Sequence, residues 1–292
     1  MNQARKKLVS AAGICAAALY LLLQPRQSAA AVSEGLRLCL DRIVPALLPY
    51  LVLSGLFLSS GGAQALGRRV GGGIQKLFHI GSSGVIALIL GLTGGYPVGA
   101  KTAAQLCRDG IVTKSDAQRL LNFCNNAGPA FLFGVVGAAC YRSSAVGAAL
   151  YAIHALSALF CGIFLRGKRP PMETMPPQKP IPDFSESFFS AVKGAGRTLG
   201  MICLLVALFS VCIDAIRNVL PIGGAASAIV TSFLELSSGC FAVASSPLPW
   251  AAKFSLTAAS VGWGGVCVHM QTLAEIRGAG LSIRPYLQAK AL

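Results

Sequence analysis

The stretch that decides the fold is residues 82–109, which read SSGVIALILGLTGGYPVGAKTAAQLCRD. Its apolar first part, Val85–Leu92, is too short to cross a bilayer, because a membrane-spanning helix needs about 20 apolar residues. The segment TGGYP at 93–97 then interrupts it, since glycine and proline both weaken a continuing helix. A second arm ends at Arg108-Asp109. We predict a re-entrant hairpin that enters and leaves a membrane on the same side.

The composition around this stretch excludes a soluble domain. Of 292 residues, 54% are hydrophobic and 12% are charged, and the mean hydropathy is +0.65. A soluble protein carries about 25% charged residues. Long runs without Asp, Glu, Lys or Arg cover Leu8–Pro25, Ile43–Gly67, Leu77–Ala100, Leu120–Tyr141, Ser143–Leu165 and Phe254–Ala274. The chain is therefore expected to be a polytopic α-helical membrane protein.

The N-terminus combines a basic cluster with an apolar segment. Arg5-Lys6-Lys7 precedes Leu8–Leu23, the order found in both signal peptides and signal anchors. We favour an uncleaved signal-anchor helix over residues 1–31. The alternative is cleavage near the small residues 28–31.

A second interrupted apolar segment occurs later in the chain. Residues 223–249 contain no Lys or Arg and are broken at 235–239 by ELSSG. We expect a first repeat at 32–165, a Pro-rich cytoplasmic linker at 166–183 and a second repeat at 184–292. Interrupted segments at matched positions are typical of inverted-repeat transporters. The expected fold class is all-α, with about six transmembrane helices and two re-entrant hairpins in two inverted repeats.

The basic residues give an orientation. The formal charge is +15, from 25 Lys and Arg against 10 Asp and Glu. With both termini cytoplasmic, 19 of the 25 fall in or beside the cytoplasm, as cytoplasmic loops of membrane proteins require. This explains the charge without a nucleic-acid partner. The six expected outside are Arg26, Arg37, Arg42, Arg142, Arg217 and Lys253.

The tip of the first hairpin is the leading candidate for a solute site. Backbone N–H groups at the start of its second arm form a helix N-terminus that favours anions, and a lysine follows within one turn. The alternative is that the glycines only permit close helix packing and that the lysine reaches the cytoplasmic surface. The residues concerned are Thr93, Gly94, Gly95, Tyr96, Gly99 and Lys101.

Two further groups of polar residues lie in apolar segments. Asn122, Asn125 and Asn126 precede Gly128-Pro129, and amides there bind either a solute or cation, or hold helices together. Glu235, with Ser237 and Ser238, interrupts the second hairpin. An intramembrane carboxylate suggests a coupling proton or an ion pair with Lys101 or Lys253. The alternative places Glu235 at the outer interface, where it only caps the break.

Nothing in the sequence favours an enzyme. The three histidines, His79, His154 and His269, are far apart and lack metal-ligand spacing, and no HExxH or GxSxG motif occurs. We therefore expect no cofactor, no metal and no catalytic residue.

Three segments carry a further signal: DRIVPALLPY at 41–50, GLTGGYPVGAK at 91–101, and AQRLL at 117–121 followed by NNAGPAF at 125–131. Together they resemble the YlbJ-type sporulation integral membrane proteins, which belong to the group carrying the nucleoside recognition or Gate domain. The resemblance spans nearly all of residues 32–165 and is looser in the second half, around Glu235-x-x-Ser238-Gly239.

This resemblance implies a membrane protein of endospore formation, in the mother-cell or outer forespore membrane, that moves a small anionic or polar-aromatic solute such as dipicolinate. A nucleoside-type permease and a non-conducting scaffold for spore-envelope assembly remain alternatives. The expected partners are the lipid bilayer, the solute, and a coupling proton or cation. A homo-oligomer is left open.

Overall fold

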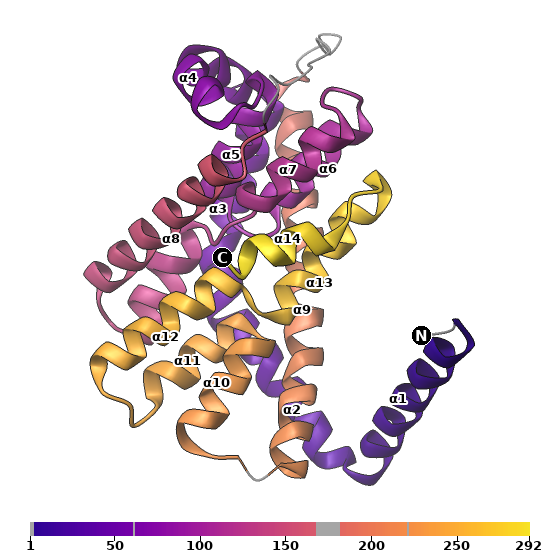
Figure 1. The fold of residues 1–292 in the computed structure, drawn as a ribbon. Helices are drawn as coiled ribbons and strands as arrows, with labels where there is room; N and C mark the ends of the chain where they lie inside the picture. The colour runs from indigo at the N-terminus through magenta and orange to yellow at the C-terminus, as the bar shows by residue number, and fades with distance from the viewer. Residues whose placement is uncertain (1–2, 61, 168–181, 221) are drawn as a thin grey trace.

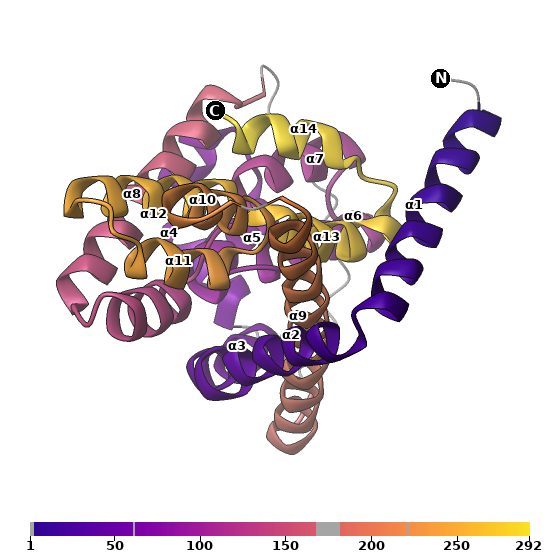
Figure 2. The ribbon, with the colours of Figure 1, turned by 90° about the horizontal axis from the view of Figure 1, so that it is seen from below.

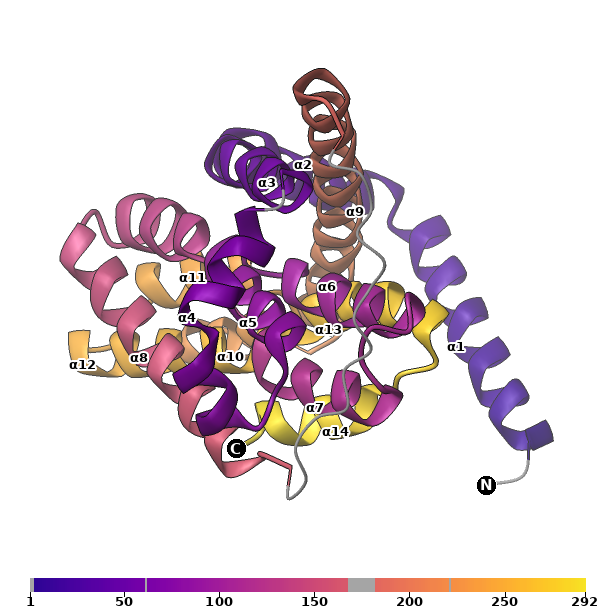
Figure 3. The same ribbon diagram turned by 90° about the horizontal axis from the view of Figure 1, so that it is seen from above.

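The computed structural model describes residues 3–60, 62–167, 182–220 and 222–292. Within these ranges all regular elements are helices, so the all-helical class is confirmed. Helix α9 (Phe184–Val219) runs along the height of the bundle in Figure 1. Helix α1 (Gln3–Leu23) stands apart from the other helices in all three views (Figures 1–3). Most of the expected linker 166–183 lies outside the described residues.

The first half of the fold begins with a continuous helical run that packs against α9. It consists of α2 (Pro25–Leu38), the π-helical turn η1 (Cys39–Ile43) and α3 (Val44–Ser59). It crosses the expected boundary at residue 31 without a break. Glycines bring it close to α9, since a Cβ at Gly35 would meet Ala207 and one at Gly55 would meet Ala191. Small residues at such contacts let helix backbones approach.

The first hairpin forms where the sequence places it. Helix α5 (Ser82–Gly94) and helix α6 (Val98–Arg108) are its two arms. Ahead of it, α4 (Gly62–Phe78) lies at the upper end of the molecule in Figure 1, and its last part meets α5 at 89°. Seen from above, helices α4 to α7 gather on one side of α9 (Figure 3).

A broken helix follows the hairpin. Helix α7 (Lys114–Cys124) stops at Asn125, and the chain resumes as the π-helical η2 (Ala130–Cys140). The break contains Gly128-Pro129, and proline removes a backbone donor that a continuing helix would use. Helix α8 (Ser144–Phe164) then returns to the upper end of the molecule (Figure 1).

The second half also contains a hairpin followed by a broken helix. After α9, helices α10 (Gly224–Leu234) and α11 (Leu236–Ser245) form the second hairpin. Helices α12 (Trp250–Trp263) and α13 (Gly265–Ile276) are separated by Gly264, whose φ is +86°. A short turn, η3 (Arg277–Ala279), leads to α14 (Ile283–Lys290).

The two hairpins open towards opposite ends of the molecule. In Figure 1 the open end of α5 and α6 lies at the top, and that of α10 and α11 lies at the bottom. Viewed from below, α10, α11 and α12 lie together on one side of α9 (Figure 2). The largest core joins both halves, because Phe131 and Leu132 of η2 pack with Leu236, Val261 and Val268.

Among the described residues, two helices are long and apolar enough to cross a membrane, α8 and α9. A third qualifies if the bent pair of α4 and α5 counts as one span. The remaining apolar segments are shorter helices separated by breaks. Several large apolar side chains of α9 are exposed, among them Leu204 and Leu208, as expected for a lipid-facing surface. The six-span arrangement stays a prediction.

Candidate functional site

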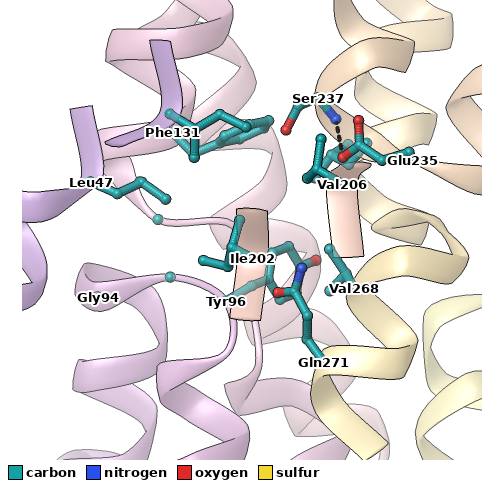
Figure 4. Close-up of a pocket in the computed structure, with 14 residues that line it drawn as sticks. Leu47, Gly94, Tyr96, Phe131, Ile202, Val206, Glu235, Ser237, Val268 and Gln271 are labelled. Carbon is teal, nitrogen blue, oxygen red and sulfur yellow. Dashed lines mark hydrogen bonds between the residues drawn. The ribbon is translucent and has the colours of Figure 1, made fainter. Parts of the chain in front are cut away.

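The tips of the two hairpins meet at a cavity in the middle of the bundle (Figure 4). The volume of this cavity is about 50 Å³. Pockets that hold small organic ligands are about 300–1,000 Å³, so in this conformation the cavity is too small for such a ligand. We call it the central cavity. It is lined by Ile43, Leu47, Gly94, Gly95, Tyr96, Gly128, Phe131, Ile202, Val206, Glu235, Leu236, Ser237, Val268 and Gln271.

The first hairpin contributes its tip to this cavity. Gly95 has a φ of +77° and touches the backbone of Gly128 in the α7–η2 break. Only glycine takes this conformation at little cost and leaves room for such contact. Tyr96 follows, and its hydroxyl donates to the Val261 carbonyl at 3.3 Å. The tip of the first hairpin is therefore tied to both broken helices.

The second hairpin contributes a buried carboxylate. Glu235 is 2% exposed and precedes α11 as its N-cap. Its Oε1 accepts from the Ser237 amide at 2.9 Å, and its Oε2 accepts from the Ser238 amide at 2.6 Å. These bonds satisfy two free donors of the helix start. The sequence leaves capping of the break as one interpretation of Glu235. In the structure Glu235 caps α11, and it does so at the central cavity.

The lining of the central cavity has one acidic group, the carboxylate of Glu235, and no basic group, since it contains no Lys, Arg or His. No ion pair involves Glu235 among the described residues; Lys101 is exposed, and the Lys253 ammonium donates to the Ala244 carbonyl. The pairing of Glu235 with either lysine is therefore not present in this conformation.

Lys101 and the start of α6 lie outside the central cavity. Lys101 lines a separate cleft of about 380 Å³ between α3, α6 and α9. The Val98 amide donates to the Gly95 carbonyl at 2.8 Å, and the Ala100 amide donates to Asn125 Oδ1 at 3.2 Å. Because the Val98 amide is already paired and Lys101 lies outside the central cavity, these contacts do not support the predicted anion site, for which Val98 and Gly99 were the expected donors.

Three other predicted site residues also lie outside the central cavity. Thr93 is exposed, and its hydroxyl donates to the Ile89 carbonyl at 2.8 Å. Gly99 packs on the backbone of α7, where a Cβ would overlap the Cys124 carbonyl oxygen. Ser238 lines a different cleft, between α2, α9, α10 and α11. The packing interpretation of the glycines therefore fits Gly99, whereas Gly94 and Gly95 line the cavity.

Asn125 joins the two halves of the protein. It is completely buried at the α7–η2 break. Its Nδ2 donates to Thr272 Oγ1 at 2.9 Å and to the Tyr286 hydroxyl at 3.2 Å, while its Oδ1 accepts from the Ala100 amide. One side chain thus connects α6, α13 and α14. This agrees with the interpretation that the amide holds helices together.

Replacing Asn125 by leucine is expected to destabilise the protein by about 2 kcal/mol or more, because each buried polar group left without a partner costs about 1–3 kcal/mol. The free energy of unfolding in detergent would measure this. Asn122→Leu is the matched control, since Asn122 Oδ1 has no hydrogen-bond partner to lose. Equal losses in both variants would contradict the role of Asn125 as a connection.

Asn122 and Asn126 face a third place, which we call the side cleft. It lies between α7, α8 and α14, and His154 and Lys290 also line it. Asn126 Nδ2 donates to the Phe123 carbonyl at 2.8 Å. The structure therefore divides the predicted site residues: Gly94, Gly95, Tyr96, Glu235 and Ser237 share the central cavity, and the two asparagines do not.

Sequence reasoning missed three polar residues near these cavities. Gln271 lines the central cavity. It lies in the run Phe254–Ala274, whose lack of charged residues predicts a membrane-spanning helix and no site. His154 accepts from the Ala127 amide at 2.9 Å within the α7–η2 break. Lys290 was counted only as a cytoplasmic charge, yet it lines the side cleft. A polar residue inside a charge-free run was the available signal for the first two.

Comparison with known proteins finds a curated relative. It is the sporulation integral membrane protein YlbJ of Bacillus subtilis (strain 168), which is 29% identical to this chain over 146 residues. The match covers 50% of this chain and 36% of the relative. No family model matches the chain, and no solved structure matches it. The resemblance to YlbJ-type sporulation membrane proteins is confirmed, and a membrane role in sporulation is consistent with it.

Proposed function

We propose that this protein is a membrane permease of endospore formation and that the central cavity is its solute-binding site. The observation that carries the proposal is the meeting of two hairpin tips, from opposite ends of the bundle, around one buried carboxylate. Interrupted helices that meet in this way form the central site of inverted-repeat transporters. An intramembrane carboxylate is functional by default.

The proposed solute is small and anionic or polar-aromatic, and dipicolinate is the first candidate. A buried carboxylate repels an anion, so an anion would need a compensating charge to occupy the central cavity. We propose that Glu235 binds a proton or cation as the solute enters, which would couple the two movements. The small cavity then represents a solute-free state, and movement of one hairpin relative to the other would enlarge it.

A nucleoside-type solute is the second candidate, and the cavity lining favours it directly. Aromatic side chains at Tyr96 and Phe131 offer surfaces for a flat base. Glu235 and Gln271 offer hydrogen-bond partners for its polar edge, and the lining has no Lys, Arg or His to select an anion. An uncharged solute would need no compensating charge.

Vesicles with the inserted full chain test these proposals. Uptake of dipicolinate and of uridine would be measured at several pH values, against vesicles without protein. We expect flux of one of the two solutes, and a steep pH dependence if that solute is dipicolinate. No flux of either solute would favour the scaffold that does not conduct.

The proposed membrane arrangement has two inverted repeats and both termini in the cytoplasm. In a variant without the ten native cysteines, single cysteines at Gly72 and Gly223 should react with an impermeant reagent from opposite sides. The reason is that α4 and the start of α10 lie at opposite ends of the bundle (Figure 1). Labelling of both positions from one side would exclude this arrangement.

A further inference from the structure

The side cleft is the best candidate for a second binding site. Its volume is about 570 Å³, which falls within the range of about 300–1,000 Å³ for small-molecule sites. Its walls are largely apolar, with Phe123, Phe160 and Ala158 among them, and its polar groups are few. The central cavity is far smaller in the same conformation. The side cleft therefore has the room that the central cavity lacks.

One cation faces this cleft without a carboxylate partner. Lys290, in the last turn of α14, forms no ion pair among the described residues. Its ammonium donates to the Tyr96 hydroxyl at 3.3 Å and lies 5.3 Å from the ring centroid of Tyr96. Its contacts among the described residues are with a phenol and with the rings of Tyr96 and Tyr286, and none is with a carboxylate. This partly buried ammonium is under-compensated, because burial of a charge is costly unless it is paired. An anionic group in the cleft would complete its surroundings.

Two amide oxygens in the same cleft lack donors. Asn126 is completely buried, and its Oδ1 has no hydrogen-bond partner. Its orientation is fixed because Nδ2 donates to the Phe123 carbonyl. Asn122 Oδ1 is likewise buried and unpaired. Buried acceptors are normally paired, so these two oxygens point to a ligand that carries O–H or N–H donors.

We propose that the side cleft binds a small organic acid that has an apolar body and at least one O–H or N–H donor. Lys290 pairs with its acidic group, the Asn122 and Asn126 oxygens accept from its donor, and Phe123 and Phe160 contact its apolar part. Tyr96 connects this cleft to the central cavity, since its ring lines one and its hydroxyl binds the lysine of the other. Release of Lys290 from Tyr96 would link binding to movement of the first hairpin tip, and only this last step rests on the proposed function.

Binding of para-hydroxybenzoate to the full chain in lipid nanodiscs tests the site. This probe has a carboxylate, a flat apolar ring and an O–H donor. We expect Lys290→Met to weaken binding by about tenfold or more, which corresponds to about 1.4 kcal/mol, because the variant loses a hydrogen bond between charged groups. Lys290→Arg should retain most of the affinity. Lys114→Met is the matched control, since Lys114 is exposed at the start of α7.

Parent protein that does not bind the probe, or Lys290→Met that binds as tightly as the parent, would overturn the proposal. If Lys290→Met does not fold, the uncharged methyl ester of the probe replaces it, and equal binding of ester and acid by the parent overturns the proposal. Failure of the permease is a separate result. Binding without flux would reject transport alone, and flux without binding would reject this cleft alone.

Discussion

Replacing Glu235 by glutamine is expected to lower solute flux per inserted molecule by about tenfold or more, which corresponds to about 1.4 kcal/mol in the barrier. Glu235 supplies the one carboxylate of the central cavity, and glutamine has nearly the same shape without the charge. The variant can no longer bind a coupling proton or cation at this position. If the solute is dipicolinate, flux should therefore also lose most of its dependence on pH.

Glu235 also caps α11, so its replacement changes the stability of this helix as well as the chemistry of the cavity. Glutamine keeps one oxygen that can accept from the Ser237 or Ser238 amide, so α11 should lose no more than a cap is worth, about 0.5–2 kcal/mol. Flux is therefore normalised to the amount of folded protein in the vesicles. Glu186→Gln is the control, because Glu186 is exposed in the first turn of α9. Unchanged specific flux and pH dependence in Glu235→Gln would reject the coupling role.

Replacing Gly91 by alanine is expected to prevent most of the protein from folding, with a loss of about 3 kcal/mol or more, at the upper end of overpacking effects. A Cβ at Gly91 would overlap the carbonyl oxygen of Cys124, the last residue of α7. A Cβ at Gly99, on the other arm, would overlap the same oxygen. The obstacle is backbone in each case, so no rotamer change relieves it. Both arms of the first hairpin need this contact with α7.

The matched control for Gly91→Ala is Gly200→Ala on α9. A Cβ at Gly200 has no atom within 4 Å, and alanine favours a helix over glycine by about 1 kcal/mol. Gly200→Ala should therefore be as stable as the parent or slightly more so. The yield of monodisperse protein in detergent and its free energy of unfolding would measure both variants. A stable Gly91→Ala protein would mean that α5 and α7 are less closely packed than described.

The side cleft and the central cavity suggest different roles for polar residues that sequence reasoning grouped together. Asn125 is used entirely for connection, with three hydrogen bonds inside the protein. Asn126, its neighbour, keeps an unpaired oxygen in a cleft. Adjacent residues at a helix break point in different directions, so one becomes structural and the other remains available for a ligand.

The sequence by itself determined where three of the helix breaks lie, although it did not indicate the break at Gly264. Gly95 and Pro97, and Gly128 and Pro129, lie at breaks in the structure, whereas of the ELSSG segment at 235–239 only Glu235 does, because α11 already begins at Leu236. These are local effects, because proline lacks a donor and glycine accepts a backbone conformation that other residues avoid. The low charge likewise determined that the helices would be apolar. Such properties follow from each residue and its nearest neighbours.

Only the tertiary structure decided which polar groups meet. It separated Lys101 from the central cavity, added Gln271 to that cavity, and placed Lys290 beside Tyr96, which is 194 residues away along the chain. These outcomes depend on how each helix is rotated about its axis and on which distant segments pack together. Both are determined by the sum of many side-chain contacts across the two halves, and no single motif contains that information.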